Sequence, residues 1–204
     1  MSRNIIVGAG EYLHKAERLA QDLGLVVERV ELETQDQYNF DLTRLRQVAE
    51  PEACHVFVAL DGRAINRARH KLISEVRLAG YPLMNLVSSA AHIEPDVRMM
   101  GNVHIGPGCS VSSSVDLGVG CWLDSQVSLG QGVSLAACVT LIAGVVLDRD
   151  AKVGRGSTIG PASFVPAGAR VGRHCEWLLP GAVPVELPDG CFFDQLMPQG
   201  ARIF

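Results

Sequence analysis

The fold of this chain is decided by residues 103–147, which read VHIGPGCSVSSSVDLGVGCWLDSQVSLGQGVSLAACVTLIAGVVL. Every sixth residue in this stretch is a large aliphatic one. The same phase continues in both directions without an insertion, and the whole ladder is Val87, Ile93, Met99, Ile105, Val111, Leu117, Leu123, Leu129, Leu135, Leu141, Leu147, Val153, Ile159, Val165, Val171, Trp177 and Val183. No helix or ordinary strand has a period of six, whereas a parallel β-helix of hexapeptides does. We therefore predict a triangular prism in which three hexads close one coil, and residues about 18 apart stack.

A second ladder of smaller residues stands two positions before each large one. Its members are Val97, Val103, Cys109, Val115, Cys121, Val127, Val133, Val139, Val145, Ala151, Ser157, Ser163, Ala169, Cys175 and Gly181. We expect it to be the second inward position of a narrow prism. Glycine often follows the large residue, as at Gly106, Gly118 and Gly154, which indicates a corner that needs either a positive φ or a close backbone approach.

The region before the ladder alternates between strand-like and helix-like patterns. We expect strands at residues 3–8, 25–30, 55–60 and 82–87, and helical segments at 12–23, 42–49 and 63–79. This alternation predicts a small parallel α/β domain over residues 1–86. It is followed without a flexible linker by the prism over 87–183. Residues 184–204 form a C-terminal tail, ending in Ile203 and Phe204, that we expect to fold back on the prism or onto a neighbour.

Bulk composition excludes several classes of function. The chain has a net charge of −4 and no basic run, so we expect no nucleic-acid partner. It has no apolar stretch long enough to span a membrane, and its N-terminus lacks a signal-peptide pattern. The six cysteines have no CxxC spacing. We therefore expect reduced thiols, a cytoplasmic location and no metal site.

An α/β lobe joined directly to a hexapeptide prism resembles one family, the bacterial sugar O/N-acyltransferases. These include the N-acetyltransferases of the sialic acid, bacillosamine and perosamine pathways. The resemblance covers residues 3–183 and is carried by the strand followed by Gly8-Ala9-Gly10, by the segment MNLVSSAAHIEPDV at 84–97, and by the hexads. It implies a Rossmann-like domain that binds a nucleotide sugar and a left-handed β-helix. It also implies a homotrimer, with acetyl-CoA or another acyl-CoA as co-substrate between two prisms and a histidine as general base.

Three residues are candidates for the catalytic chemistry. Counted by hexads, the position of the family's histidine falls on Gln131, and glutamine has no useful proton affinity near neutral pH. Gln131 either orients the acceptor through hydrogen bonds or is an ordinary solvated residue. Asp124 could be the base if it were buried at a subunit seam, or it caps its own turn. His104 could be the base if the acceptor site has shifted, or it is a surface or interface histidine.

Two further groups of residues are binding candidates. Basic side chains on the later coils either bind the phosphates of CoA or solubilise an outward face, and they are Arg149, Lys152, Arg155, Arg170 and Arg173. The turn Gly8-Ala9-Gly10 either cradles a phosphate at a helix N-terminus or is a tight strand-to-helix connection. Asp61-Gly62-Arg63 stands where the resemblance places a turn of the nucleotide-sugar site.

Two functions remain open on the sequence alone. The first is an acyl-CoA-dependent acyltransferase that modifies the amino group of a nucleotide-linked sugar in surface polysaccharide biosynthesis. The second is a trimeric homologue that kept the scaffold, lost the base, and binds a ligand or partner without acyl transfer. A zinc enzyme on the same prism would need three histidines on adjacent coils, and the central coils contain none.

Overall fold

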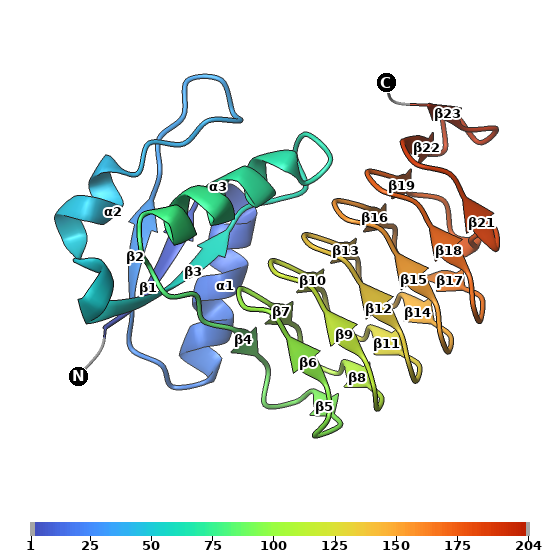
Figure 1. The fold of residues 1–204 in the computed structure, drawn as a ribbon, viewed down its shortest axis with the longest axis horizontal. Helices are drawn as coiled ribbons and strands as arrows, with labels where there is room; N and C mark the ends of the chain where they lie inside the picture. Colours follow the sequence, from blue (N-terminus) through green and yellow to red (C-terminus); the bar gives the residue numbers. More distant parts are fainter. Residues whose placement is uncertain (1–2, 203–204) are drawn as a thin grey trace.

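The computed structural model describes residues 3–202 as an α/β unit packed against a stack of short strands (Figure 1). The α/β unit has a three-stranded parallel sheet in the order β2-β1-β3. Its elements are β1 (Arg3–Gly8), α1 (Gly10–Asp22), β2 (Val27–Glu31), α2 (Thr43–Val48), a 3-10 helix (Pro51–Ala53), β3 (Cys54–Ala59) and α3 (Arg67–Leu78). The first three predicted strands and all three predicted helical segments are therefore confirmed within a few residues.

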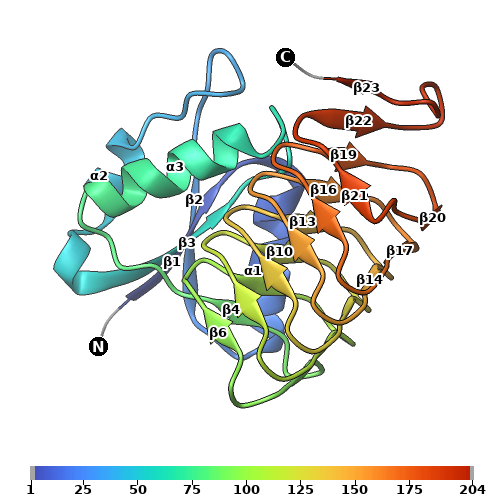
Figure 2. The ribbon, with the colours of Figure 1, turned by 45° about the vertical axis from the view of Figure 1, so that its right-hand side comes forward.

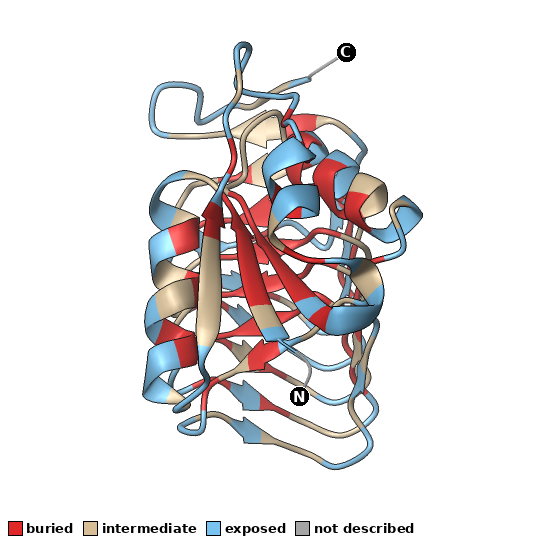
Figure 3. Ribbon diagram, turned by 90° about the vertical axis from the view of Figure 1, so that its left-hand side faces the viewer, coloured by how far each residue is buried: buried red, intermediate tan, exposed pale blue. Residues whose placement is uncertain are grey.

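Helices cover both faces of this sheet (Figure 3). Because side chains alternate along a strand, Ile5 and Val7 of β1 pack with residues of α2 and α3, whereas Ile6 packs with α1. The α1 side also contains Leu86 and Trp122 of the stack, so this core is shared by the sheet and the stack, whereas the interior of the stack is a separate core. The predicted fourth strand at 82–87 is present only in part. Leu83 makes a single bridge to Val56, and the next residues already belong to the stack.

The stack is a β-solenoid whose strands form three sheets, each named for its first strand and parallel throughout except for β23. The β4 sheet contains β4 (Leu86–Val87), β7 (His104–Ile105), β10 (Trp122–Leu123), β13 (Thr140–Leu141), β16 (Thr158–Ile159), β19 (Glu176–Trp177), β22 (Cys191–Phe193) and β23 (Ala201–Arg202). The β5 sheet contains β5 (His92–Ile93), β8 (Ser110–Val111), β11 (Ser128–Leu129), β14 (Val146–Leu147), β17 (Ser163–Val165) and β20 (Gly181–Ala182). The β6 sheet contains β6 (Arg98–Met99), β9 (Asp116–Leu117), β12 (Ser134–Leu135), β15 (Lys152–Val153), β18 (Arg170–Val171) and β21 (Glu186–Leu187).

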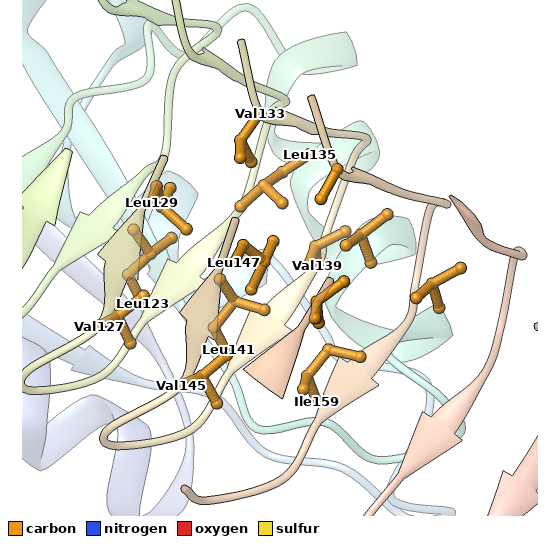
Figure 4. Close-up of a cluster of buried hydrophobic side chains, with 14 of the residues drawn as sticks. Leu123, Val127, Leu129, Val133, Leu135, Val139, Leu141, Val145, Leu147 and Ile159 are labelled. Carbon is orange, nitrogen blue, oxygen red and sulfur yellow. The ribbon is translucent and has the colours of Figure 1, made fainter. Parts of the chain in front are cut away.

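The predicted register of the prism is confirmed. Residues 18 positions apart pair in parallel, as Leu123 does with Leu141, and Figure 2 shows the resulting rungs from β10 to β19. The large residues of the central coils point inward and are at most 2% exposed (Figure 4). The small ladder is buried beside them from Val103 to Cys175. The two ends of this ladder differ, since Val97 is only partly buried and Gly181 is exposed.

The glycines after the large residues are explained by close approach. A Cβ on Gly118 would lie 2.6 Å from the backbone carbon of Ala136, and one on Gly154 would lie 2.5 Å from the carbonyl oxygen of Gly172. The left-handed conformation is instead adopted two positions later, for example at Gly120 with a φ of 73°. Of the two reasons that the sequence allowed, backbone proximity between coils is the operative one.

The expectation that the ladder stops at Val183 is wrong. Leu187 pairs with Val171 and Phe193 with Trp177, so β21 and β22 continue two of the sheets. These partners are 16 residues apart instead of 18, because the coil is two residues shorter after Val183. A count by sixes from Val183 therefore no longer falls on the inward residues. β23 then pairs antiparallel with β22. Leu196 is 89% exposed, and Ile203 and Phe204 lie outside the described residues.

The α/β unit is fixed to the solenoid by hydrogen bonds as well as by the shared core. The Asn102 side chain accepts a hydrogen bond from the N–H of Val58 at 2.6 Å and donates one to the Val58 carbonyl at 2.9 Å. The amide thus replaces the neighbour that the outer edge of β3 lacks at this position. We call this contact surface the junction. Among residues 3–202, no helix is long and apolar enough to cross a membrane.

Candidate functional site

The first candidate site is a cleft at the junction, between α1 and one corner of the solenoid. Its volume is about 350 Å³. Glu11, His14, Lys15 and Arg18 of α1 line one side of it, and His104, Pro107, Asp124 and Ser125 of the solenoid line the other. We call it the α1 cleft. It brings together two of the three residues that the sequence suggested for catalysis.

His104 is held in one orientation and one tautomer at the base of this cleft. Its ring stacks on Trp122 with a centroid separation of 3.8 Å and an interplanar angle of 1°. Its Nδ1 lies 3.1 Å from the carbonyl oxygen of Leu123, which can only accept, so Nδ1 carries the proton and Nε2 the lone pair. Burial lowers the pKa of His104 to about 4. The imidazole is therefore a neutral hydrogen-bond acceptor at neutral pH.

Asp124 supplies a carboxylate to the same cleft. Its side chain is 25% exposed and lies 3.4 Å from Nζ of Lys15, which also pairs with Glu11 at 3.2 Å. Its other oxygen accepts the N–H of Ser125 at 3.0 Å. The turn-capping role that the sequence suggested is therefore present. The carboxylate still faces the cleft, where Lys15 is its only ion-pair partner among residues 3–202.

Gln131 lies at a different corner of the prism from His104 and Asp124. It is exposed in the turn between β11 and β12, where the β5 and β6 sheets meet, whereas Asp124 follows β10 at the corner of the β4 and β5 sheets. Its backbone carbonyl accepts the N–H of Asp150 at 2.9 Å from the next coil. Within one chain, the structure does not bring Gln131 together with the other two catalytic candidates.

The predicted substrate-binding residues converge at the carboxyl ends of β1 and β3. Gly8 touches β3 so closely that a Cβ would lie 1.8 Å from the Ala59 carbonyl oxygen, which explains the glycine by packing. Asp61 binds the Arg63 guanidinium at 2.7 and 2.8 Å, and this hydrogen bonding lowers the pKa of Asp61. The Arg63 guanidinium lies 4.0 Å from the place of a Cβ on Gly10. One cationic group therefore stands beside the Gly8-Ala9-Gly10 turn.

The predicted phosphate-binding cations are divided among three places. Lys152 and Arg170 are register partners on the exposed face of the β6 sheet. Arg149 lies at another corner, where its N–H is bound by Asp148. Arg155 and Arg173 occupy successive corners between the β6 and β4 sheets, where they line a second cleft together with Arg67 and His174. We call this the α3 cleft.

A buried polar network beside the α3 cleft had no signal in the sequence. Arg69 of α3 is 0% exposed and donates to the carbonyl oxygens of Leu60 and Cys138 and, at 2.7 Å, to the Thr140 hydroxyl. The Thr140 hydroxyl in turn donates to the side chain of Asn66 at 2.9 Å. Arg69 looked like one of several basic residues on a helix, and only the packing of α3 against the solenoid reveals its role.

The chain is similar to known proteins in its structure and not detectably in its sequence. No protein-family model matches the sequence, and no curated protein matches it. Solved structures do match. The acetyltransferase domain of PglB from Neisseria gonorrhoeae FA1090, in complex with acetyl coenzyme A, is 21% identical with a TM-score of 0.80, and the match covers 100% of both chains. The chain shares the fold of this acetyltransferase domain.

Two further solved structures are similar over nearly the whole chain. WeeI from Acinetobacter baumannii AYE is 16% identical with a TM-score of 0.61, covering 94% of this chain and 96% of its own. PerB from Caulobacter crescentus, in complex with CoA and GDP-perosamine, is 24% identical with a TM-score of 0.50, covering 94% and 93%. The similarity therefore includes the α/β unit as well as the solenoid.

Proposed function

We propose that this chain is an acyl-CoA-dependent acyltransferase, with acetyl as the expected acyl group. Its acceptor is the amino group of a nucleotide-linked sugar used in surface-glycan biosynthesis. The observation that carries the proposal is the end-to-end likeness to the PglB acetyltransferase domain, which was solved with acetyl coenzyme A. The similarity to PerB, solved with CoA and GDP-perosamine, supports the class of acceptor.

The two parts of the chain have separate roles in this proposal. Residues 1–86, as a Rossmann-like unit, bind the nucleotide sugar near the Gly8-Ala9-Gly10 turn and Arg63, where backbone N–H groups and a cation suit a phosphate. The solenoid from residue 87, of left-handed sense, holds the acyl donor. Six free buried thiols support a cytoplasmic location, where acyl-CoA is made.

We place the proton transfer in the α1 cleft. The sugar amine attacks the thioester carbonyl, a C–N bond forms, the C–S bond breaks, and the amine proton passes to the protein while CoA leaves as thiolate. Asp124 accepts this proton, because its carboxylate faces the cleft. His104 orients the amine through Nε2, since its other nitrogen is fixed on Leu123.

A homotrimer is part of the same proposal. Val146 and Phe164 are register partners on the outer face of the β5 sheet and are 39% and 41% exposed. They therefore place two adjacent apolar side chains on the outer face of the β5 sheet, where a second subunit could pack. Sedimentation velocity on the full chain should give a mass three times that of the monomer, and a monomer would contradict this part of the proposal.

The test of the function is thiol release from acetyl-CoA with a panel of UDP-, dTDP- and GDP-linked amino sugars. With an accepted sugar, Asp124→Asn should lower kcat by about 100-fold or more, because it removes a proton acceptor. His104→Ala should raise KM and lower kcat. Asp148→Asn is the matched control. Asp148 accepts the N–H of Arg149 at 2.7 Å, as Asp124 accepts the N–H of Ser125 at 3.0 Å, but it lines neither the α1 cleft nor the α3 cleft.

Gln131→Ala tests where the chemistry occurs, and calorimetry separates the two functions that the sequence left open. Loss of turnover in Gln131→Ala with normal rates in Asp124→Asn would show that the reaction takes place at the corner between the β5 and β6 sheets and not in the α1 cleft. Binding of CoA and a nucleotide sugar by calorimetry without thiol release would favour the binding homologue. The binding homologue is supported by Gln131, which the hexad count places where the family has its histidine, and by the exposure of this residue. A chain that shows no binding and no turnover would contradict the transferase proposal.

A further inference from the structure

Basic side chains from two distant parts of the chain meet in the α3 cleft. Arg67 and His70 come from the first turn of α3, whereas Arg155 and His174 come from successive corners of the solenoid. Two adjoining cavities of about 220 and 320 Å³ share Arg67, Arg155 and His174, and Arg173 lines the larger one. The cleft is therefore enclosed on both sides by cationic groups.

These charges are poorly balanced by the protein itself. Among residues 3–202, the one carboxylate that lines the cleft belongs to Asp189. One of its oxygens accepts the Arg173 N–H at 2.7 Å, and the other accepts the Arg173 guanidinium at 2.8 and 2.6 Å. Arg67 and Arg155 have no ion pair among residues 3–202. Like charges held this close repel one another, so a bound anion would lower the energy of the cleft.

The start of α3 adds hydrogen-bond donors to the same space. Asn66 is its N-cap residue, but its side chain makes no cap hydrogen bond. The Asn66 amide instead donates to the Gly156 carbonyl at 3.1 Å and to the Thr158 hydroxyl at 3.0 Å. The N–H of Arg67 is bound by the Ala64 carbonyl at 3.0 Å, and the N–H groups that follow it lack the side-chain oxygen that usually satisfies them. An anion at this end would also meet the positive end of the helix dipole.

We propose that the α3 cleft binds a phosphate group carried by one of the two substrates of the proposed transferase. The identity of the ligand rests on the proposed function. Guanidinium groups match the geometry of phosphate oxygens, and Arg67 and Arg155 approach the space from opposite walls. The phosphate has two sources, the ADP part of acyl-CoA or the diphosphate of the nucleotide sugar. The cleft is distinct from the α1 cleft and from the turn at Gly8.

Isothermal titration calorimetry on the full chain tests this site without requiring turnover. The probes are inorganic phosphate, 3′,5′-ADP and UDP, and the variants are Arg67→Ala, Arg155→Ala and the double substitution. Each single substitution should weaken the best nucleotide probe by about tenfold or more, as expected for loss of a charged hydrogen bond. The matched control is Arg77→Ala, which removes the same charge from the exposed far end of α3.

The preferred probe identifies the source of the phosphate. Tighter binding of 3′,5′-ADP assigns the cleft to acyl-CoA, and tighter binding of UDP assigns it to the nucleotide sugar. The proposal is overturned if no probe binds, if binding survives the double substitution, or if Arg77→Ala weakens it equally. Binding without thiol release would refute the transferase and leave the phosphate site intact. Normal KM values in the double variant would refute the site and leave the transferase intact.

Discussion

His104 shows how burial changes the chemistry of a single side chain at the junction. The imidazole is 4% exposed, lies against Trp122 and is hydrogen-bonded to Leu123. Desolvation favours its neutral form and lowers its pKa from the ordinary 6.5 to about 4. A histidine that a sequence suggests as a base with a pKa near 7 is therefore a fixed hydrogen-bond acceptor in the fold.

This shift makes the stability of the protein depend on pH. Between pH 6.5 and 4 the unfolded chain binds a proton at His104 that the folded chain does not, so stability is complete above pH 6.5 and falls as the pH is lowered towards 4. The loss should reach about 3 kcal/mol. Urea unfolding at several pH values should show a clearly shallower dependence in His104→Phe. The same slope in His104→Phe and in the native chain would contradict this assignment.

A control separates His104 from the other histidines. His92 lies on an early coil, and its side chain is 76% exposed. Urea unfolding of His92→Gln over the same pH range therefore gives the effect of removing an exposed imidazole, with which the effect of His104→Phe is compared. Equal changes in the two variants would show that loss of any histidine accounts for the effect.

At the scale of the element, a hexad is defined as much by its glycines as by its leucines. The inward ladder was predicted residue by residue, because the period of six survives in the sequence wherever coils are 18 residues long. The last coil was missed because it is two residues shorter, and nothing in the composition after Val183 marks the change. The clefts were also missed, since they depend on which solenoid face α1 and α3 cover.

Substituting a glycine between coils should cost more than substituting one in an open corner. A Cβ on Gly118 meets backbone atoms of Ala136 and Ala137 at 2.6 and 2.7 Å, which can only move if the coils separate. A Cβ on Gly144 has its nearest neighbour at 4.0 Å, although its φ of 71° is unfavourable for alanine. We expect Gly118→Ala to destabilise by about 2–3 kcal/mol and Gly144→Ala by about 1.

The midpoint of urea unfolding measures this difference. Both variants have the same change in side chain and differ in the space available to it, so each serves as the reference for the other. Equal midpoints would mean that the coils yield easily, and the close approach would then not be the reason for these glycines.

For the whole molecule, the junction joins two parts that the sequence could only list in order. Direct succession without a flexible linker indicates that the two parts are close together, but it does not identify the surfaces in contact. Asn102 completes the edge of β3, Arg69 reaches the solenoid from α3, and Trp122 belongs to the core of the α1 side. None of these three residues carries a pattern in sequence, because each contact joins segments dozens of positions apart.

We therefore expect the chain to unfold in one cooperative transition. The two tryptophans report on different places, Trp122 at the junction and Trp177 in a late coil. In Trp177→Phe and in Trp122→Phe, the remaining tryptophan's fluorescence and the far-ultraviolet circular dichroism should give the same denaturant midpoint. A Trp177 signal that changes at a midpoint different from the circular dichroism would show that the late coils unfold by themselves.

The reversal of direction at β23 has a consequence for self-association. A stack of parallel coils presents unpaired N–H and C=O groups at its ends, where another chain could continue the sheet. At β22, the antiparallel β23 occupies that edge, and it offers two residues of opposite polarity to any strand that would extend the coil pattern. In this one of the three sheets, the parallel pattern that makes each coil a template for the next is interrupted by a reversed strand, which opposes fibre-like growth through the β4 sheet.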